Sequence, residues 1–385
     1  MGQIVQVGVT EEADMGRYVG SWQRMASLWC FAAAAAAAGS TTPAALPPIR
    51  HVFLIVLENE PYLTTFGAQS PARYLAKELP AKGALLTEYF GIGHYSLDNY
   101  IAMISGQAPN ADTQNDCPIF NEFTRTAPGL DANGQAPGQG CIYPADVKTL
   151  AGQLDTAALR WRGYMQDMGA DPARESAACG HVPIGAADYT NHASARDEYA
   201  DKHDPFVYFH SIIDDAVYCR RHVVNLEELV QDLHEERTTP NFAFITPDLC
   251  RDGHDVPCKN GAPGGLISAD RFLHVWVPRI LASPAFRADG LLIITFDEGT
   301  DASACCGEEG LPGGPPPGRF GPGGGRIGAV LLSSFIAPGT ESSRPYNHYS
   351  LLRTLEDLFG LPHLGYAGVP QLSSFGPDVF TASRP

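Results

Sequence analysis

Positive charge is scarce in this sequence. The 385 residues include 26 lysines and arginines against 43 acidic residues, which gives a formal net charge of −17 at pH 7. A surface of this sign repels nucleic acid and anionic membranes, so we expect neither as a partner. A phosphate-bearing ligand would therefore need local positive charge from a metal ion, from histidines or from backbone N–H groups.

The sequence also lacks an apolar run long enough for a stable membrane span. Its most apolar stretch, residues 26–38, has 13 residues, follows two arginines and precedes small residues. This pattern is typical of a secretory signal peptide. We therefore predict a signal peptide and linker over residues 1–49, a single domain over 50–385, and secretion to the periplasm or the medium. An Ala-rich surface helix is the alternative for the apolar stretch.

Metal-binding cysteine motifs are absent too: no Cys-x-x-Cys pair accompanies a histidine cluster, so we expect no structural zinc site. Of the nine cysteines, Cys30 lies in the predicted signal peptide. The eight others suit a disulfide framework in an oxidising compartment, although spacing alone does not determine connectivity. The adjacent Cys305 and Cys306 form either a vicinal disulfide or two longer links. The other plausible pairs are Cys117–Cys141, Cys179–Cys219 and Cys250–Cys258.

Helical and strand-like segments alternate along the chain, which predicts one α/β unit. The aliphatic runs 51–57 and 291–296 have the composition of strands buried on both faces of a parallel sheet. We predict a mostly parallel sheet flanked by helices on both faces, with irregular loops over 109–140 and 307–325. The other predicted strands are 84–90, 241–246 and 327–333, and the predicted helices are 96–105, 147–157, 225–236, 268–281 and 348–359.

Two of these strands end in adjacent oxygen ligands, Glu58 with Asn59 and Asp297 with Glu298. In an open α/β sheet, ligands bind outside the carboxyl ends of the strands. Carboxylate and amide oxygens suit Mg²⁺, Ca²⁺ or Mn²⁺, and suit Zn²⁺ less well. Like charges in a dry crevice also need a cation or a proton to neutralise them. We therefore predict one divalent cation held by these side chains; separate solvated loop acids are the alternative.

Ser96 opens one of the predicted helices. A hydroxyl in this position lies at the positive end of the helix dipole, where a phosphate also binds. A neighbouring metal ion lowers the hydroxyl pKa and favours attack on phosphorus. We therefore predict Ser96 as a nucleophile and Asn99, one turn on, as a donor to a phosphoryl oxygen. An ordinary N-cap is the alternative role for Ser96.

Four histidines lie near the same predicted sheet edge. An imidazole can protonate a leaving alcohol or, when charged, hold a phosphate oxygen, which favours acidic pH. The predicted catalytic histidines are His94, His203 and His254. His348 and Lys202 are predicted to bind substrate. A histidine in a loop is often structural, so we expect at least one of the four to have no chemical role.

Several polar motifs stand in a fixed order along the chain, in segments 51–59, 94–106, 202–205, 252–255, 293–298 and 347–356. In this order they resemble motifs of the bacterial phosphoesterase family that includes acid phosphatases and phospholipases C. Within that family, the chain resembles secreted acid phosphatases of the phosphatidylinositol 3-phosphatase type. Tyr95 and Asp98 stand where the family usually has proline, which leaves the identity of the substrate open.

The resemblance implies an alkaline-phosphatase-like core, with the four strand-end ligands on the metal, Ser96 as nucleophile and the three histidines as phosphate-binding or proton-transfer groups. The expected activity is hydrolysis of a phosphoric monoester, and the expected partner is a small phosphorylated substrate or a phospholipid head group. A phospholipase C-type phosphodiesterase is the alternative among enzymes. A non-catalytic ligand-binding protein on the same fold is the alternative from another class.

Overall fold

The computed structural model describes residues 46–307, 310–311 and 313–382. These residues belong to one compact unit. The signal peptide and linker predicted over 1–49 fall almost wholly outside the described residues and stay a prediction. Within the described part of the chain, no helix combines the length and the apolar character needed to cross a bilayer.

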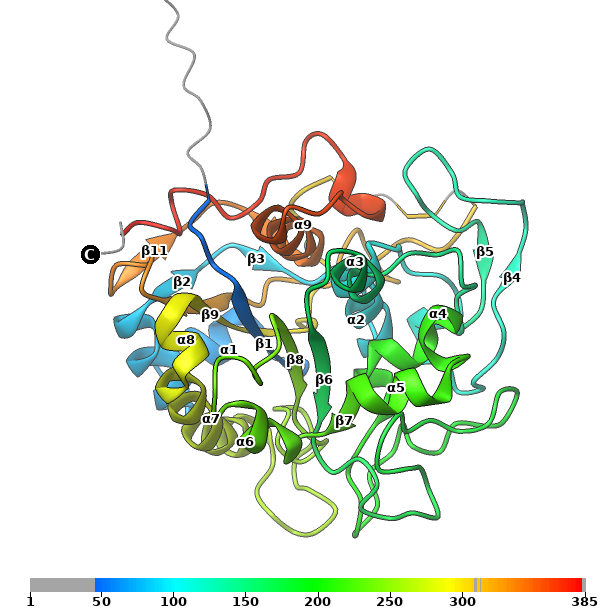
Figure 1. Ribbon diagram of the computed structural model, residues 1–385, viewed down its shortest axis with the longest axis horizontal. Coiled ribbons are helices and arrows are strands. Elements are labelled where there is room, and N and C mark those ends of the chain that lie inside the picture. Colours follow the sequence, from blue (N-terminus) through cyan, green and yellow to red (C-terminus); the bar gives the residue numbers. More distant parts are fainter. Residues whose placement is uncertain (1–45, 308–309, 312, 383–385) are drawn as a thin grey trace, which may run out of the picture. The chain divides into compact units, whose positions relative to one another are not determined.

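An eight-stranded sheet forms the centre of the fold (Figure 1). Neighbouring strands run parallel except at β10, which is antiparallel to both of its neighbours. The predicted mostly parallel α/β fold is therefore confirmed. Two short ribbons lie outside this sheet, β12 (Tyr346–Asn347) with β3 (Tyr89–Phe90) and β4 (Thr124–Arg125) with β5 (Gly138–Gln139). The strands of the main sheet, in spatial order, are β11 (Thr340–Ser342), β2 (Ala84–Leu86), β10 (Ala329–Ser333), β9 (Gly290–Phe296), β1 (His51–Leu57), β8 (Phe242–Thr246), β6 (Trp161–Met165) and β7 (Val223–Asn225).

Helices flank the sheet on both faces. Figure 1 shows α2, α3 and α9 grouped on one side and α7 and α8 on the other, in agreement with their mutual contacts. The α-helices are α1 (Tyr62–Phe66), α2 (Ser96–Ser105), α3 (Leu150–Thr156), α4 (His210–Ile213), α5 (Ala216–His222), α6 (Glu228–Asp232), α7 (Gly265–Ala282), α8 (Pro284–Asp289) and α9 (His348–Phe359). The short π- and 3₁₀-helices are η1 (Tyr74–Glu78), η2 (Pro80–Lys82), η3 (Thr113–Asn115), η4 (Asp201–His203), η5 (Pro205–Tyr208) and η6 (Gly365–Gly368).

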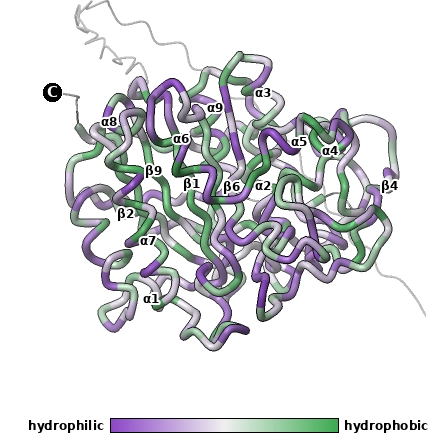
Figure 2. The backbone as a smooth tube through the Cα atoms, turned by 60° about the horizontal axis from the view of Figure 1, so that its bottom comes forward, coloured by the Kyte–Doolittle hydropathy of each residue, from purple (hydrophilic) through white to green (hydrophobic). Residues whose placement is uncertain are grey.

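Strands β1 and β9 position the site. They are parallel neighbours, every residue in both is buried, and Figure 2 shows them as largely hydrophobic segments of the chain. Their register pairs Leu57 with Phe296, so the two strands end at the same level of the sheet. The polar residues that follow each strand therefore leave the sheet side by side.

Two predicted helices match the structure closely. The segments 96–105 and 348–359 form α2 and α9, and each ends at a glycine with positive φ, Gly106 at 68° and Gly360 at 67°. This backbone conformation costs glycine little, which is why glycine often follows the last turn of a helix.

Other boundaries differ from the predictions. The helix predicted over 225–236 is wrong in extent, because β7 includes Asn225 and α6 is short. The segment 84–90 forms two strands, β2 and β3, rather than one. The pattern analysis does not detect β6, because Arg162 and Gly163 interrupt its apolar residues.

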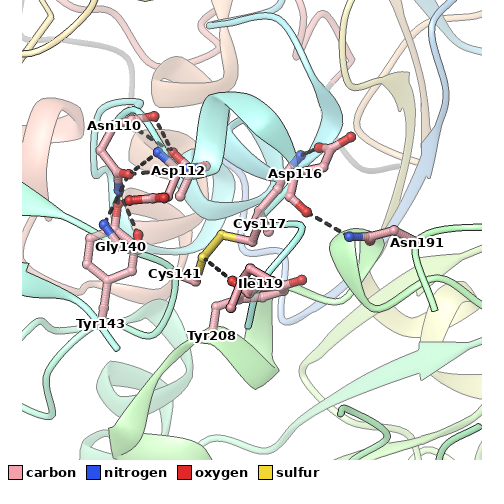
Figure 3. The surroundings of a disulfide bond; sticks show 12 residues. Asn110, Asp112, Asp116, Cys117, Ile119, Gly140, Cys141, Tyr143, Asn191 and Tyr208 are labelled. Carbon is pink, nitrogen blue, oxygen red and sulfur yellow. Dashed lines mark hydrogen bonds between the residues drawn. A yellow bond between two sulfur atoms is a disulfide. The ribbon is translucent and has the colours of Figure 1, made fainter. Parts of the chain in front are cut away.

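All eight cysteines in the described residues form disulfides. The three predicted pairs are confirmed, and Cys305 bonds to Cys306, which decides between the two alternatives for that pair. Figure 3 shows the Cys117–Cys141 bond next to Asp116, whose backbone oxygen accepts a 2.7 Å hydrogen bond from the amide of Asn191. This disulfide therefore anchors a loop that reaches the candidate site described next.

Candidate active site

Ser96, the first residue of α2, directs its hydroxyl at the end of β1. Its Oγ donates a 2.6 Å hydrogen bond to Oε2 of Glu58, and both side chains are buried. The N-cap of α2 is Tyr95, whose side chain makes no capping bond, and Oδ1 of Asp116 accepts a 3.0 Å hydrogen bond from the N–H of Leu97 in the first turn. The Ser96 hydroxyl therefore does not serve as an N-cap and is instead bound to a carboxylate at a strand end.

The loop before α2 has an unusual backbone that aims Ser96. Tyr95 has a φ of 75°, a left-handed conformation that is rare for an aromatic residue. At Gly93, a Cβ atom would lie 2.4 Å from Oδ2 of Asp98, so a larger residue there would displace the buried Asp98 carboxylate. The Asn99 side chain accepts from two backbone N–H groups of the loop and donates to two of its carbonyls. The structure thus directs the Asn99 amide into the loop, where it shapes the approach to Ser96.

The strand ends bring three carboxylates to the same place. The backbone N–H of Asn59 donates to Oδ1 of Asp297 at 2.9 Å, which links the two strand ends directly. The N–H of Tyr95 donates to Oε1 of Glu298 at 3.0 Å, which links the Ser96 loop to the second strand end. Oδ2 of Asp297 is buried without a hydrogen-bond partner. Glu58, which holds the Ser96 hydroxyl, completes the cluster.

This cluster concentrates negative charge in a buried space. Burial and the charges of Glu58 and Glu298 raise the pKa of Asp297 well above its usual range. Burial also raises the pKa of Glu298, although its hydrogen bond with His94 opposes the effect. Burial acts in the same direction on Glu58, but neighbouring cationic groups, above all His203, outweigh it and lower the pKa of Glu58 to about 2. A bound cation would relieve the mutual repulsion.

The donor set fits a hard divalent cation. Three carboxylates join the amide of Asn59, and the buried Oδ2 of Asp297 would gain a partner from a bound ion. The ligand atoms of these carboxylates do not all lie within 4.8 Å of one another. In the described residues, one group of three does meet that distance, Glu198 with Cys250 and Cys258, but the two sulfurs are joined in a disulfide. Oxygens on opposite sides of a Ca²⁺ ion lie about 5 Å apart, so convergence within 4.8 Å is not a requirement for binding such an ion.

His94 and His254 are each held by a carboxylate. His94 pairs through Nδ1 with Glu298, and its Nε2 lies 3.1 Å from the backbone oxygen of Asp301. The hydrogen bond with Glu298 raises the pKa of His94. Nδ1 of His254 lies 3.2 Å from Oδ1 of Asp255, and this hydrogen bond raises the pKa of His254. Both rings therefore stay protonated to higher pH than a free imidazole.

His203 is buried between two carboxylates. Its Nε2 lies 3.3 Å from Oε2 of Glu58 without a well-aligned hydrogen bond, and its Nδ1 lies 4.0 Å from Oδ2 of Asp252. The ring stacks on Tyr100, whose hydroxyl donates to Oε1 of Glu58 at 2.5 Å. The sequence analysis does not single out Tyr100 or Asp252. Both residues lie in segments that resemble motifs of the phosphoesterase family, and this position could have marked them as candidates.

His348 is buried against the backbone of Asp297. Its Nε2 is 2.5 Å from the backbone oxygen of Asp297, and its Nδ1 is 3.1 Å from the hydroxyl of Tyr89. Burial lowers the pKa of His348 to about 4, so the ring is neutral. With both nitrogens engaged, His348 supports Asp297 and does not reach a substrate in this structure.

A cavity of about 550 Å³ reaches Tyr95, the residue before Ser96. Tyr95, Lys202 and His254 line it, and they come from three different loops. Nζ of Lys202 lies 3.0 Å from Oδ2 of Asp116, the residue next to the disulfide in Figure 3. Burial would lower the pKa of Lys202, but the carboxylate of Asp116 outweighs it and raises that pKa, so the ammonium keeps its charge beside the cavity.

A serine hydroxyl, cationic side chains and buried carboxylates at the ends of parallel strands define a class of site suited to phosphoryl chemistry. Residues 72–362 match the Phosphoesterase family, and the chain belongs to that family. The resemblance drawn from the sequence motifs is therefore confirmed.

Named relatives agree with this membership. The chain is 26% identical over 320 residues to an acid phosphatase of Aspergillus fumigatus, which covers 81% of this chain and 55% of the fungal protein. It is 24% identical over 330 residues to the phosphatidylinositol-3-phosphatase of Mycobacterium tuberculosis, which covers 84% of this chain and 81% of that protein. The chain thus spans about half the length of the fungal relative. A solved structure from the alkaline phosphatase superfamily of Vibrio parahaemolyticus aligns with 86% of this chain and 72% of its own, with a TM-score of 0.44 and 14% identity.

Proposed function

We propose that this protein is a phosphoric monoester hydrolase in which Ser96 is the nucleophile. The observation that carries the proposal is the 2.6 Å hydrogen bond from Oγ of Ser96 to Oε2 of the buried Glu58, at the end of a central strand. Family membership and the names of both relatives, an acid phosphatase and a phosphatidylinositol-3-phosphatase, support the same reaction class.

A bound phosphate would lie near the carboxylates of Glu58, Asp297 and Glu298, so nearby positive charge must offset the repulsion between them. His94 and Lys202 supply positive charge at the edge of the site, and the N-terminus of α2 adds the positive end of its helix dipole. A divalent cation, held by the four ligands Glu58, Asn59, Asp297 and Glu298, would stabilise charge on the phosphoryl oxygens and lower the pKa of the Ser96 hydroxyl.

In the first step, Oγ of Ser96 forms a bond to phosphorus and the bond to the leaving-group oxygen breaks. The hydrogen bond to Glu58 orients Oγ of Ser96, and the proton of Ser96 passes to a non-bridging oxygen of the phosphate, because a carboxylate with a pKa of about 2 is a poor proton acceptor. Because Nδ1 of His254 faces Asp255, Nε2 is the nitrogen that donates a proton to the leaving oxygen. The product is an alcohol and a phosphoserine.

In the second step, water attacks the phosphoserine and the bond between phosphorus and Oγ breaks. His254, now neutral, accepts the proton of the attacking water at Nε2, so it has the opposite role in each half-reaction. Ser96 regains its proton from the departing phosphate, and inorganic phosphate leaves. Each residue thus returns to its starting protonation state.

The decisive experiment is hydrolysis of p-nitrophenyl phosphate by the wild type and by Ser96→Ala. We expect the variant to lose at least about 10³-fold in kcat, because no other group takes the position of the nucleophile. Ser105→Ala is the matched control: Ser105 is equally buried at the other end of α2, and its hydroxyl bonds to the backbone of Ile101.

A folded Ser96→Ala protein with near wild-type turnover would overturn the nucleophile assignment. Bis-p-nitrophenyl phosphate tests the alternative of a phosphodiesterase, which would hydrolyse it faster than the monoester. Divalent-metal binding without turnover of either substrate would instead support the non-catalytic alternative.

We also infer that the protein is exported. Four disulfides in the described residues support this, because disulfides persist in oxidising compartments. Expression of the full chain in a bacterial host should yield protein in the periplasm or medium with its N-terminus removed near residue 40, which intact-mass spectrometry would detect. Reduced, unprocessed protein in the cytoplasm would contradict export.

A further inference from the structure

The cavity that includes Tyr95 and His254 in its wall has lining residues that the proposed mechanism does not use. Tyr95, Lys202 and His254 adjoin the reacting groups, whereas His192 and Lys259 come from other segments of the wall. A leaving group that extends away from the phosphorus enters this space. The residues that line the rest of the cavity therefore indicate which chemical groups the leaving group carries.

The acidic residues of the cavity wall already have partners. Oδ2 of Asp116 lies 3.0 Å from Nζ of Lys202. Oδ1 of Asp255 lies 3.2 Å from Nδ1 of His254. Oδ1 of Asp188 accepts two 2.9 Å hydrogen bonds, from the backbone and the hydroxyl of the threonine two positions on. The first two contacts offset negative charge locally, whereas Asp188 is bonded only to neutral groups and its Oδ2 is buried without a hydrogen-bond partner.

Lys259 differs from the other charged lining residues. Among the ion pairs of the described residues none involves Lys259, and its side chain is exposed. Its turn is anchored by the Cys250–Cys258 disulfide. The N–H of Cys258 donates to the oxygen of Ala262 at 3.1 Å, and the N–H of Gly261 donates to the oxygen of Cys258 at 3.0 Å. A cation on an anchored turn loses little freedom when it binds an anion.

A second cation lies at the same wall. The guanidinium carbon of Arg319 is 4.6 Å from the centre of the Tyr95 ring, and Tyr95 lines the cavity. Arg319 belongs to the Gly- and Pro-rich segment that follows the second strand-end pair. Arg319 therefore lies against a residue of the wall without lining the cavity, whose own lysines are Lys202 and Lys259.

We propose that this cavity binds the leaving group of a substrate that carries a second anionic group, and that Lys259 selects for that group. The inference rests on the proposed monoesterase function. The reacting phosphate lies at Ser96, while the second anion lies against the Lys259 ammonium. A phosphate or a phosphodiester fits this description, so a sugar bisphosphate and a phospholipid with a monophosphorylated head group both qualify.

The test compares butyl phosphate with butane-1,4-diyl bisphosphate, which differ only in the second anion. For the full-length enzyme, we expect Lys259→Ala to lower kcat/KM for the bisphosphate about tenfold, mainly through KM, as expected for one charge-assisted hydrogen bond. Turnover of butyl phosphate should stay within about twofold. Lys259→Arg keeps the positive charge and should retain most of the preference.

Lys148→Ala is the matched control, because Lys148 is exposed and lines a different cavity. Equal losses on both substrates, or no loss on either, would overturn the inference. Hydrolysis of p-nitrophenyl phosphate separates the two levels of failure. If the wild type hydrolyses it and Lys259→Ala shows no selective loss, the cavity assignment fails and the proposed function stands. If no monoester is hydrolysed, both fail.

Two further substrates distinguish the sources of the second anion. One is a sugar bisphosphate, and the other is a dispersed short-chain phospholipid with a head-group monophosphate. Of these two substrates, the one that belongs to the natural substrate class should show the larger decrease in kcat/KM when Lys259→Ala is compared with the wild type. The absence of a drop with both would overturn the role of Lys259.

Discussion

The hydroxyl of Tyr100 donates a 2.5 Å hydrogen bond to Oε1 of Glu58, whose other oxygen accepts the hydrogen bond from Ser96. The ring of the same tyrosine stacks on His203, with 5.2 Å between ring centres and 11° between ring planes. Tyr100 therefore orients the carboxylate and the imidazole together, and we describe it as a positioning residue.

Tyr100→Phe keeps the stacked ring and removes the hydrogen bond. We expect kcat to fall about tenfold with KM within about twofold, because the lost contact orients Glu58 rather than substrate. Tyr100→Leu removes the stacking as well and should lower kcat further. Tyr164→Phe is the control, since the buried Tyr164 hydroxyl bonds to Asp232 at 2.6 Å in a different part of the sheet. Steady-state kinetics in which all three variants behave alike would rule out a special role for Tyr100.

Removal of divalent metal should abolish activity. The repulsion among Glu58, Asp297 and Glu298 is costly without a cation, so we expect dialysis against a chelator to remove at least about 90% of turnover and added Mg²⁺, Ca²⁺ or Mn²⁺ to restore it. Asp297→Asn should weaken metal affinity at least about tenfold in calorimetric titration. Glu356→Gln, a buried carboxylate outside the site, should bind metal as the wild type does. Full activity in chelator would exclude the metal.

The pH dependence should follow His254. Its raised pKa keeps the ring protonated to higher pH, so proton donation is available below that pKa and is lost as pH rises through it. Asp255→Asn removes the main cause of the shift and should move the descending limb of the kcat profile to lower pH. His254→Gln should slow alkyl phosphates at least about tenfold while sparing p-nitrophenyl phosphate, whose leaving group needs no proton.

His274→Gln provides the comparison for that experiment. The side chain of His274 is 53% exposed against 55% for His254, and it also faces an aspartate, Asp270, but it lies on α7. Its pH profile should match the wild type. A His254→Gln enzyme that slows both substrates equally would argue against proton donation to the leaving group.

Glu356 should make stability depend on pH. Burial raises the pKa of Glu356 from 4.5 to about 9, and its Oε2 has no hydrogen-bond partner. The folded state therefore retains a proton that the unfolded state loses, so the free energy of unfolding decreases as pH rises from about 4.5 to about 9. Glu356→Gln should remove this dependence and raise Tm near pH 8 by roughly 2 °C. Glu341→Gln, at an exposed position, should leave the pH dependence of stability unchanged. Identical thermal unfolding curves for the two variants across this pH range would refute the role of Glu356.

The metal-site candidates were accessible from sequence because of how parallel strands are built. Strands β1 and β9 are buried on both faces, so they appear as continuous aliphatic runs, and the ligands follow directly at their carboxyl ends. The same reasoning could not separate the histidines. His254 and His348 both follow polar residues at segment ends, and only burial shows that His254 borders a cavity while His348 is enclosed.

Asn99 shows a second limit of prediction from the sequence. Its spacing from Ser96 places it one helical turn on, and a free amide there would face a bound phosphate. The structure instead uses the amide for four contacts within the preceding loop, because that loop turns back over the first turn of α2. Local spacing predicts which face of a helix a residue occupies, but not what the neighbouring loop places opposite that face.

Local periodicity and composition were enough to predict the α/β class, the two central strands, helices α2 and α9 and the polar pairs after each strand. Three relationships depend on the tertiary structure: Ser96 bonds to Glu58, Tyr100 joins Glu58 to His203, and Lys259 lines the cavity. These relationships connect residues on separate loops and strands, and only packing around the sheet brings them within contact distance.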